Sequence, residues 1–152
     1  MTTDYTLTTE GKYAYDYPRA AHTSDAILLA KTQFGTFVLL IRRGHNPDAG
    51  KWAFPGGFME MNETCEQAAR RELTEETSLK LDMPFQLVGV YSDPERDPRG
   101  RVVTTAYMVV LAQCQPAKAA DDAAEARWFD VNDLPPLAFD HSKILKDALS
   151  KI

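Results

Sequence analysis

The distribution of apolar and polar residues along this 152-residue chain predicts several β-strands and two helices. Two apolar runs, Asp25–Ala30 and Thr36–Ile41, are separated by the turn-forming stretch KTQFG, which indicates a β-hairpin. Residues 85–91 and 102–111 are also rich in apolar residues and predict two further strands, joined by the loop SDPERDPRGR. A short strand is expected at residues 125–129.

The N-terminal segment has a different character. Residues 1–11 are polar, and we expect them to be loosely held. Between Lys12 and Tyr17 every second residue is a tyrosine, which places Tyr13, Tyr15 and Tyr17 on one face and predicts a strand. A lone edge strand would expose this aromatic stripe. The strand is therefore expected either to cover a second molecule or to fold back on its own sheet.

A helix is predicted at residues 64–77, which contain no Gly or Pro and are rich in Ala, Glu, Arg and Leu. Its start is expected at Asn62 or Glu63, or at Thr64 as an N-cap with Gln67 three residues later.

A second helix is predicted at residues 141–149, with Asp140 as its N-cap. Strands interrupted by helices in two separate stretches predict an α/β fold, in which a mixed sheet is covered on both faces. The length fits a single domain over residues 1–152.

The first predicted helix ends in an acidic group, Glu72, Glu75 and Glu76, although the helix dipole is already negative there. At 100° per residue, two of these glutamates fall on the side expected to pack inward, together with Cys65, Ala68, Ala69 and Leu79. These two, Glu72 and Glu76, are four residues apart and repel each other, so their burial calls for a cation. Oxygen ligands without nearby His or Cys favour Mg²⁺ or Mn²⁺ over zinc. The alternative is a solvated acidic helix end.

The residues before this helix strengthen the metal interpretation. Gly56 and Gly57 let the backbone approach a metal or phosphate closely. Gly57, five residues, Glu63, seven residues and then RELTEETSL resembles the signature of the Nudix hydrolases. The preceding stretch, LLIRRGHNPDAGKWAFPGG, resembles the strand and loop that lead into that signature. One position departs from it: Ser78 stands where the family usually has Gly, so the helix needs a less favourable turn or a later end.

The resemblance implies a Nudix-type α/β/α sandwich that hydrolyses a nucleoside diphosphate linked to another moiety. It implies that Glu72 and Glu76 are the principal metal ligands, with the Gly56 carbonyl as an additional ligand. Glu75 would be a further ligand or help to activate water. The remaining positions of the signature, Gly57, Glu63 and Arg71, would be structural, the last two as an ion pair.

The general base is left open by the same resemblance. Glu75, Glu76 and a glutamate from another loop, such as Glu125, are all candidates.

Two further stretches bear on the substrate. SDPERDPRGRVVTTAY and LAFDHSKI resemble segments of the ADP-ribose pyrophosphatase branch of the family and of related ADP-ribose-sensing regulators. The candidate substrate contacts are therefore Arg43, Arg96, Arg99, Phe139 and His141. Alternatively, the arginines occupy solvated surface positions, and Arg99 lies in a type I turn. His141 would then be a polar residue in the first turn of its helix.

The expected reaction is hydrolysis of ADP-ribose to AMP and ribose 5-phosphate. One alternative is a house-cleaning hydrolase of oxidised dNTPs, NADH or dinucleoside polyphosphates, and another is a binding module that senses ADP-ribose without cleaving it. The related regulators carry a DNA-binding winged helix after the Nudix part, whereas only a short segment follows Asp140 here. We therefore expect an enzyme, and, as in the ADP-ribose branch, a homodimer in which the N-terminal strand helps to cover the partner.

Charge, cysteine content and hydropathy exclude several other classes of protein. The net charge of −5 argues against a general nucleic-acid binder, but it permits a small anionic substrate if a metal supplies positive charge. Cys65 and Cys114 lie far apart without a CxxC motif, so neither a disulfide framework nor a zinc site is expected, and a reducing cytoplasm fits. The first 30 residues lack an apolar signal core, and no apolar run reaches the roughly 18 residues of a membrane helix.

Overall fold

The computed structural model describes residues 5–120 and 123–152. Over these residues the chain forms, in order, β1 (Tyr5–Leu7), β2 (Tyr13–Tyr15), β3 (Ala21–Thr32), β4 (Gly35–Arg43), β5 (Trp52–Ala53), β6 (Gly56–Phe58), α1 (Cys65–Thr77), β7 (Gln86–Tyr91), β8 (Val102–Leu111), β9 (Ala123–Asp130) and α2 (His141–Leu149). All the strands and both helices expected from the sequence are present, with ends that differ by a few residues.

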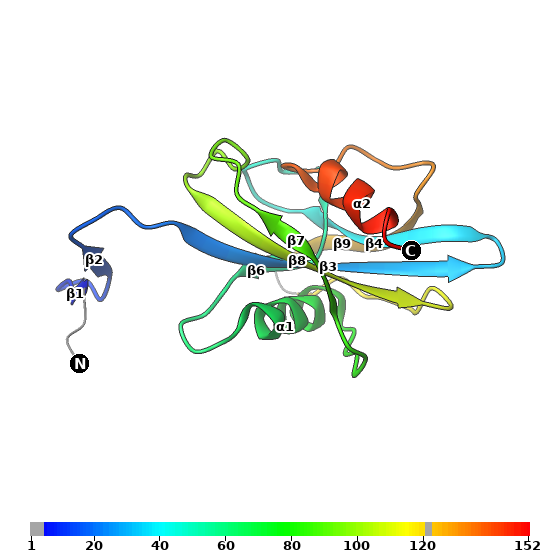
Figure 1. Ribbon diagram of the computed structural model, residues 1–152, viewed down its shortest axis with the longest axis horizontal. Coiled ribbons are helices and arrows are strands. Elements are labelled where there is room, and N and C mark those ends of the chain that lie inside the picture. Colours follow the sequence, from blue (N-terminus) through cyan, green and yellow to red (C-terminus); the bar gives the residue numbers. More distant parts are fainter. Residues whose placement is uncertain (1–4, 121–122) are drawn as a thin grey trace.

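A seven-stranded mixed sheet forms the centre of the molecule, with the strand order β5-β4-β3-β8-β7. In addition, β6 pairs with β3 and β9 pairs with β4. Strands β3 and β8 are parallel over ten residue pairs, while the other pairings are antiparallel. Figure 1 shows α1 on one face of this sheet and α2 on the other. The α/β/α sandwich predicted from the sequence is therefore confirmed.

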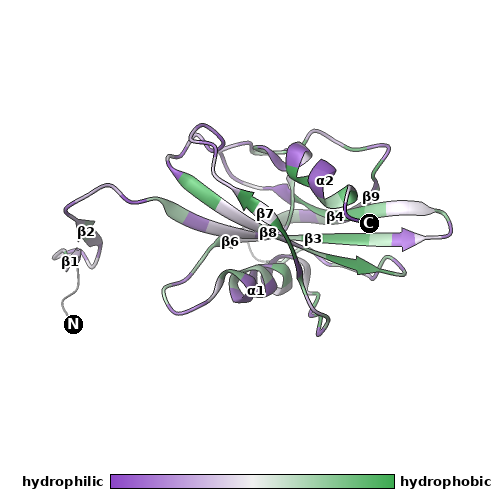
Figure 2. Ribbon diagram, viewed as in Figure 1, coloured by the Kyte–Doolittle hydropathy of each residue, from purple (hydrophilic) through white to green (hydrophobic). Residues whose placement is uncertain are grey.

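The side chains of β3 point alternately to the two faces of the sheet, which explains why the sheet has a helix on each face. Ala26 and Leu28 pack in the cluster that includes α1, whereas Ile27 and Leu29 pack in the cluster that includes α2. All four side chains are fully buried, as expected for a strand covered on both sides. Figure 2 shows hydrophobic residues gathered on the central strands and hydrophilic residues in the loops.

The segment of residues 52–58 fills a fork in the sheet. One edge of β3 pairs with β4 at Leu29–Thr32 but with β6 at Thr23–Asp25, because β3 and β4 diverge between these points. Strand β5 pairs with β4 on the other arm of the fork. No strand was predicted here from the sequence, because strands of two and three residues are too short to show a periodic pattern.

Both ends of α1 bear out the sequence-based expectations. Thr64 is the N-cap, and its side chain and that of Gln67 form a capping box. At the other end Ser78 adopts the left-handed conformation, with φ of 64°, which is the unfavourable turn expected where the family has Gly. The N–H of Lys118 donates to the Thr77 carbonyl at 3.0 Å, so the segment after β8 satisfies part of the helix end.

The N-terminal hairpin forms a two-stranded sheet of its own from β1 and β2. The Tyr5 ring lies 4.9 Å from the Tyr13 ring and 6.2 Å from the Tyr15 ring. Figure 1 shows this hairpin away from the central sheet, so the alternative that the predicted strand folds back on its own sheet is wrong. Tyr5–Leu7 form a strand within the stretch expected to be loose, while residues 1–4 lie outside the described residues.

Neither helix in the described part of the chain has the length and apolar character needed to cross a membrane.

Candidate functional site

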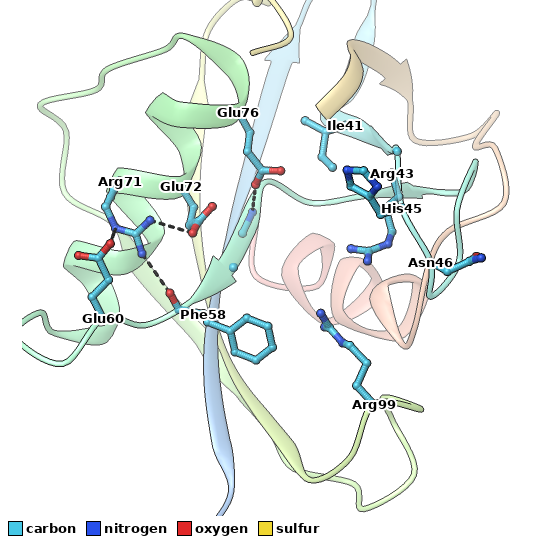
Figure 3. Close-up of a pocket in the computed structure, with 13 residues that line it drawn as sticks. Ile41, Arg43, His45, Asn46, Phe58, Glu60, Arg71, Glu72, Glu76 and Arg99 are labelled. Carbon is cyan, nitrogen blue, oxygen red and sulfur yellow. Dashed lines mark hydrogen bonds and ion pairs between the residues drawn. The ribbon is translucent and has the colours of Figure 1, made fainter. Parts of the chain in front are cut away.

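A cleft of about 430 Å³ opens beside the fork in the sheet. Two carboxylates from α1, Glu72 and Glu76, line one side of it, next to the backbone of β6. Arg43 at the end of β4 and Arg99 from the β7–β8 loop line the opposite side (Figure 3). The cleft thus places acidic groups on one wall and basic groups on the other.

Gly56 connects the sheet to the acidic wall. It pairs with Asp25 of β3, and the backbone bonds from Ala26 N–H to Pro55 O and from Met59 N–H to His22 O flank this pair. Since bonded positions alternate in an antiparallel ladder, the N–H and C=O of Gly56 both point away from β3. Its N–H donates a hydrogen bond to Glu76 Oε1 at 2.7 Å.

Gly57 gives Glu72 the room to lie against the strand. A Cβ atom at this position would overlap Glu72 Oε1 and would lie 2.6 Å from Glu72 Cδ. The same carboxylate oxygen accepts a hydrogen bond from Arg71 Nη1 at 2.8 Å. A residue other than glycine at this position would therefore push the carboxylate away from β6.

The charge of Glu76 is perturbed by its surroundings. Burial raises the pKa of its carboxyl to about 8, against the hydrogen bond from Gly56, and the negative charges of Glu72 and Asp25 add to the rise. A bound cation would favour the ionised form of such a group.

The donor set fits a hard divalent cation. Among the described residues, no three His, Cys, Asp or Glu side chains gather into a group that could hold a metal ion. The oxygen donors at this wall instead include the carboxylates of Glu72 and Glu76 and the carbonyl of Gly56, which suit Mg²⁺ or Mn²⁺.

Arg71 holds the outer part of the acidic wall. Its Nη2 lies 2.6 Å from Glu63 Oε1 and donates to the Phe58 carbonyl at 3.0 Å, which confirms the ion pair expected from the resemblance. Hydrogen bonding to Glu63 raises the pKa of Arg71. Glu75 lies 3.1 Å from Arg71 Nη1, and its side chain is 43% exposed. It is not among the residues that line the cleft.

On the basic wall, arginines and aromatic rings lie against each other. The Arg43 guanidinium lies 4.8 Å above the Phe139 ring, and its Nε donates to the Pro47 carbonyl at 2.8 Å. Burial, and then the charge of Arg99, lower the pKa of Arg43. The Arg99 guanidinium lies 4.9 Å above the Phe58 ring, whose residue is 45% exposed. Cationic and aromatic groups thus face the carboxylates across the cleft.

Arg96 and His141, also expected to contact substrate, are held in internal contacts. The Arg96 side chain is 3% exposed and donates to both carboxylate oxygens of Asp140, at 2.8 and 3.0 Å. Asp140 precedes α2 as expected, but its side chain makes no capping bond, because it binds Arg96. His141 is 3% exposed and lines only a smaller hollow beside the cleft.

Sequence reasoning missed three residues of this site. Asp25 is buried beneath Gly56, Phe58 provides an exposed ring in the cleft, and Asp97 holds Arg99 at 2.7 Å. Asp25 is a charged residue that starts an apolar run, which is a detectable anomaly. The general-base candidate Glu125 pairs with Arg127 at 3.6 Å and does not line the cleft.

The chain is similar in sequence and in structure to several known proteins. The ADP-ribose pyrophosphatase of Methanocaldococcus jannaschii is 51% identical over 110 residues, which cover 72% of this chain and 64% of that protein. The NUDIX domain of Shewanella oneidensis NrtR, solved in complex with ADP ribose, superposes with a TM-score of 0.82 and 28% identity, covering 89% of this chain and 90% of that one.

A bifunctional NMN adenylyltransferase/ADP ribose pyrophosphatase from Francisella tularensis, solved with AMP and a manganese ion, superposes with a TM-score of 0.79 and 29% identity. The match covers 90% of this chain and 43% of that one. The family model that describes the NUDIX domain matches residues 21–148. The chain therefore belongs to the NUDIX domain family.

Proposed function

We propose that this chain hydrolyses ADP-ribose to AMP and ribose 5-phosphate with the help of a divalent metal ion. The observation that carries the proposal is the pairing of walls in one cleft, with Glu72 and Glu76 opposite Arg43 and Arg99. A diphosphate needs cationic partners, and its hydrolysis needs a metal-activated water. The similarity to an ADP-ribose pyrophosphatase, to a NUDIX domain solved with ADP ribose, and to a bifunctional NMN adenylyltransferase/ADP ribose pyrophosphatase solved with AMP and a manganese ion supports this substrate.

The metal is proposed to be Mg²⁺ or Mn²⁺, held by the carboxylates of Glu72 and Glu76 and by the Gly56 carbonyl. When bound, such an ion neutralises phosphate oxygens and acidifies a water molecule for attack on phosphorus. The hydrogen bond from Gly56 N–H fixes Glu76 Oε1 and directs that carboxylate toward the cleft. Glu72 is fixed in turn by Arg71.

The basic wall is proposed to bind the substrate. Arg99 is anchored by Asp97 and Arg43 by the Pro47 carbonyl, so both guanidiniums are already oriented when substrate arrives. The remaining N–H groups of Arg43 can donate to phosphate oxygens, and those of Arg99 to the distal ribose. The Phe58 ring beside Arg99 and the Phe139 ring beside Arg43 are suited to contact with a ribose or a base.

Glu75 is proposed to act through Arg71, since it is bound to that guanidinium and lies outside the cleft lining. Its assignment as general base stays a prediction, as do those of Glu76 and Glu125.

A panel of diphosphates tests this function. Purified protein is incubated with Mg²⁺ and ADP-ribose, NADH, a dinucleoside polyphosphate or an oxidised dNTP, and the released AMP or phosphate is quantified. We expect the highest kcat/KM for ADP-ribose, with AMP and ribose 5-phosphate as products. If another compound of the panel is cleaved preferentially, that compound becomes the proposed substrate. If ADP-ribose binds tightly but is not cleaved, the result favours an ADP-ribose sensor.

We also propose a homodimer in which the N-terminal hairpin covers a second copy. Tyr13, Tyr15 and Tyr17 are 47%, 38% and 80% exposed, an aromatic surface that a partner chain would bury. Light scattering at micromolar concentration should show a dimer that is lost on deletion of residues 1–18. A monomeric full-length protein, or a dimer unchanged by the deletion, would contradict this assembly.

The compartment is proposed to be the cytoplasm, because both cysteines are free and Cys114 is exposed, which suits a reducing environment.

A further inference from the structure

Asp25 is a buried carboxylate just behind the acidic wall. It is 6% exposed, and its Oδ2 accepts a hydrogen bond from the fully buried hydroxyl of Thr104 at 2.7 Å. Thr104 belongs to β8, the parallel neighbour of β3, so the carboxylate is held from within the sheet. A charged group in such a position is costly unless something compensates it.

The other oxygen of Asp25 lies against Gly56. A Cβ atom on Gly56 would overlap Asp25 Oδ1 and would lie 2.6 Å from the Ser24 carbonyl oxygen. The two residues are direct partners in the β3–β6 ladder. Because Gly56 in turn donates to Glu76, it lies between two carboxylates, one buried and one lining the cleft.

His141 supports Asp25 from the side of α2. Its Nδ1 accepts a hydrogen bond from the Phe54 N–H at 3.2 Å, which leaves the proton of the neutral ring on Nε2. That Nε2 lies 3.8 Å from Asp25 Oδ2. The ring also stacks on Phe54 with a centroid distance of 4.7 Å. His141 is thus oriented toward Asp25 by the backbone and by a neighbouring ring.

The start of α2, and with it His141, is fastened to the β7–β8 loop by the bidentate pair of Arg96 with Asp140. A continuous series of contacts therefore links Arg96 to Asp140 and His141 at the start of α2, His141 to Asp25, and Asp25 to the backbone of β6.

We propose that Asp25 is a positioning residue for the metal site: held by Thr104 and faced by His141, it fixes Gly56 against Glu76 and strengthens divalent-metal binding without touching the ion. The proposal rests on the metal site assigned under the proposed function. It gives a role to a buried carboxylate that lines the smaller hollow beside the cleft. Outer-shell partners of metal ligands commonly contribute in this way.

The test is Mn²⁺ binding to the substrate-free protein, measured by isothermal titration calorimetry and by electron paramagnetic resonance. Asp25→Asn keeps the size of the side chain and an acceptor for Thr104 but removes the charge. We expect its Mn²⁺ affinity to fall about 10- to 100-fold. Thr104→Val, which removes the hydroxyl that holds Asp25, should lower the affinity in the same direction by a smaller factor.

The matched control is Asp147→Asn. Asp147 accepts a hydrogen bond of the same length, 2.7 Å, from the Tyr91 hydroxyl, but it does not line the cleft. This variant should lower the melting temperature without changing Mn²⁺ affinity, which separates positioning from a general loss of stability.

Two results distinguish failure of this inference from failure of the metal site. If the wild-type protein binds Mn²⁺ and Glu76→Gln abolishes binding, but Asp25→Asn stays within twofold of wild type, the role of Asp25 is overturned and the metal site stands. If the wild-type protein binds no Mn²⁺, or Glu76→Gln binds it as well as wild type does, both are overturned.

Discussion

Gly56 N–H donates a hydrogen bond to Glu76 Oε1 at 2.7 Å across 20 residues of sequence. This bond joins the strand that fills the fork of the sheet to the last turns of α1. It holds a carboxylate that is 9% exposed at the edge of a cleft whose other wall carries two arginines. The acidic helix end, unfavourable for an isolated helix, is thus explained by tertiary contacts and by the metal that we propose there.

The raised pKa of Glu76, about 8, predicts that the metal-free protein loses stability as the pH rises from 6.5 to 8. In this range the folded state keeps a proton on Glu76 that the unfolded chain has already released, so stability falls with pH. The slope is at most about 1.4 kcal/mol per pH unit.

Thermal unfolding in EDTA from pH 6.5 to 8 measures this slope, and Glu76→Gln should flatten it. The lower limit of pH 6.5 avoids His141, whose burial lowers its pKa and gives the opposite slope at more acidic pH. A wild-type slope equal to that of Glu76→Gln would show that Glu76 titrates normally.

Replacing Ser78 with glycine should stabilise the protein. Ser78 is held in the left-handed conformation with φ of 64°, where a side chain costs roughly 1 kcal/mol and glycine costs little. The hydroxyl bond to Lys118 O at 3.2 Å is exposed and offsets only part of the gain. We expect a rise in Tm of about 2–4 °C. Ser142→Gly, in an exposed position inside α2, should lower Tm, and a fall for both variants would contradict the strain argument.

Arg99→Ala should weaken binding of ADP-ribose. Removing a charge-assisted contact of roughly 1.5–3 kcal/mol lowers kcat/KM by about one to two decades, mainly through KM. The loss should be small for a nucleoside triphosphate, which has no distal ribose. Equal losses for both substrates would mean that Arg99 serves the shared phosphates, and no loss for either would make it a solvated loop residue.

Arg96→Ala should act differently, although the sequence alone predicts the same effect for both arginines. Because the Arg96 side chain is 3% exposed and paired with Asp140, its removal leaves a carboxylate without its partner at the start of α2. We expect a destabilisation of about 3 kcal/mol, at the lower end for a broken buried pair. Urea unfolding measures it, and an unchanged midpoint combined with a large rise in KM would restore Arg96 as a direct substrate contact.

Gly57→Ala should impair the metal site without unfolding the protein. The added Cβ would overlap the Glu72 carboxylate, which is the far end of a flexible side chain and can swing aside. Mn²⁺ affinity should fall about tenfold or more while Tm changes little. Gly89→Ala is the control, since the nearest atoms, on Tyr91, lie 3.4 Å from its Cβ position. An unchanged affinity for Gly57→Ala would exclude the proposed position of Glu72.

The acidic wall was predictable from sequence because its geometry is local. A helical period places Glu72 and Glu76 on one side whatever the rest of the chain does, and the capping box at Thr64 sets where the helix begins. The inward face is confirmed by the burial of Ala68, Ala69 and Glu76.

The roles of the two loop arginines and of Asp25 were not predictable in the same way. Arg96 and Arg99 lie three residues apart in one loop, yet one pairs with Asp140, 44 residues away, and the other with Asp97, two residues away. The local pattern of the loop carries no information about the long-range pairing of Arg96. Asp25 stood out in the sequence only as a charged residue at the start of an apolar run, because its partner Thr104 lies 79 residues away on a neighbouring strand.

The most direct test of the central claim is release of AMP from ADP-ribose by the wild-type protein and by Glu76→Gln at saturating Mg²⁺, with Glu66→Gln as a control on an outer position of the same helix. We predict Mg²⁺-dependent release by the wild type and by Glu66→Gln, abolition by EDTA, and a kcat for folded Glu76→Gln below about one tenth of the wild-type value. A folded Glu76→Gln that retains more than that, or a wild type equally active in EDTA, would contradict the claim that Glu76 holds the catalytic metal.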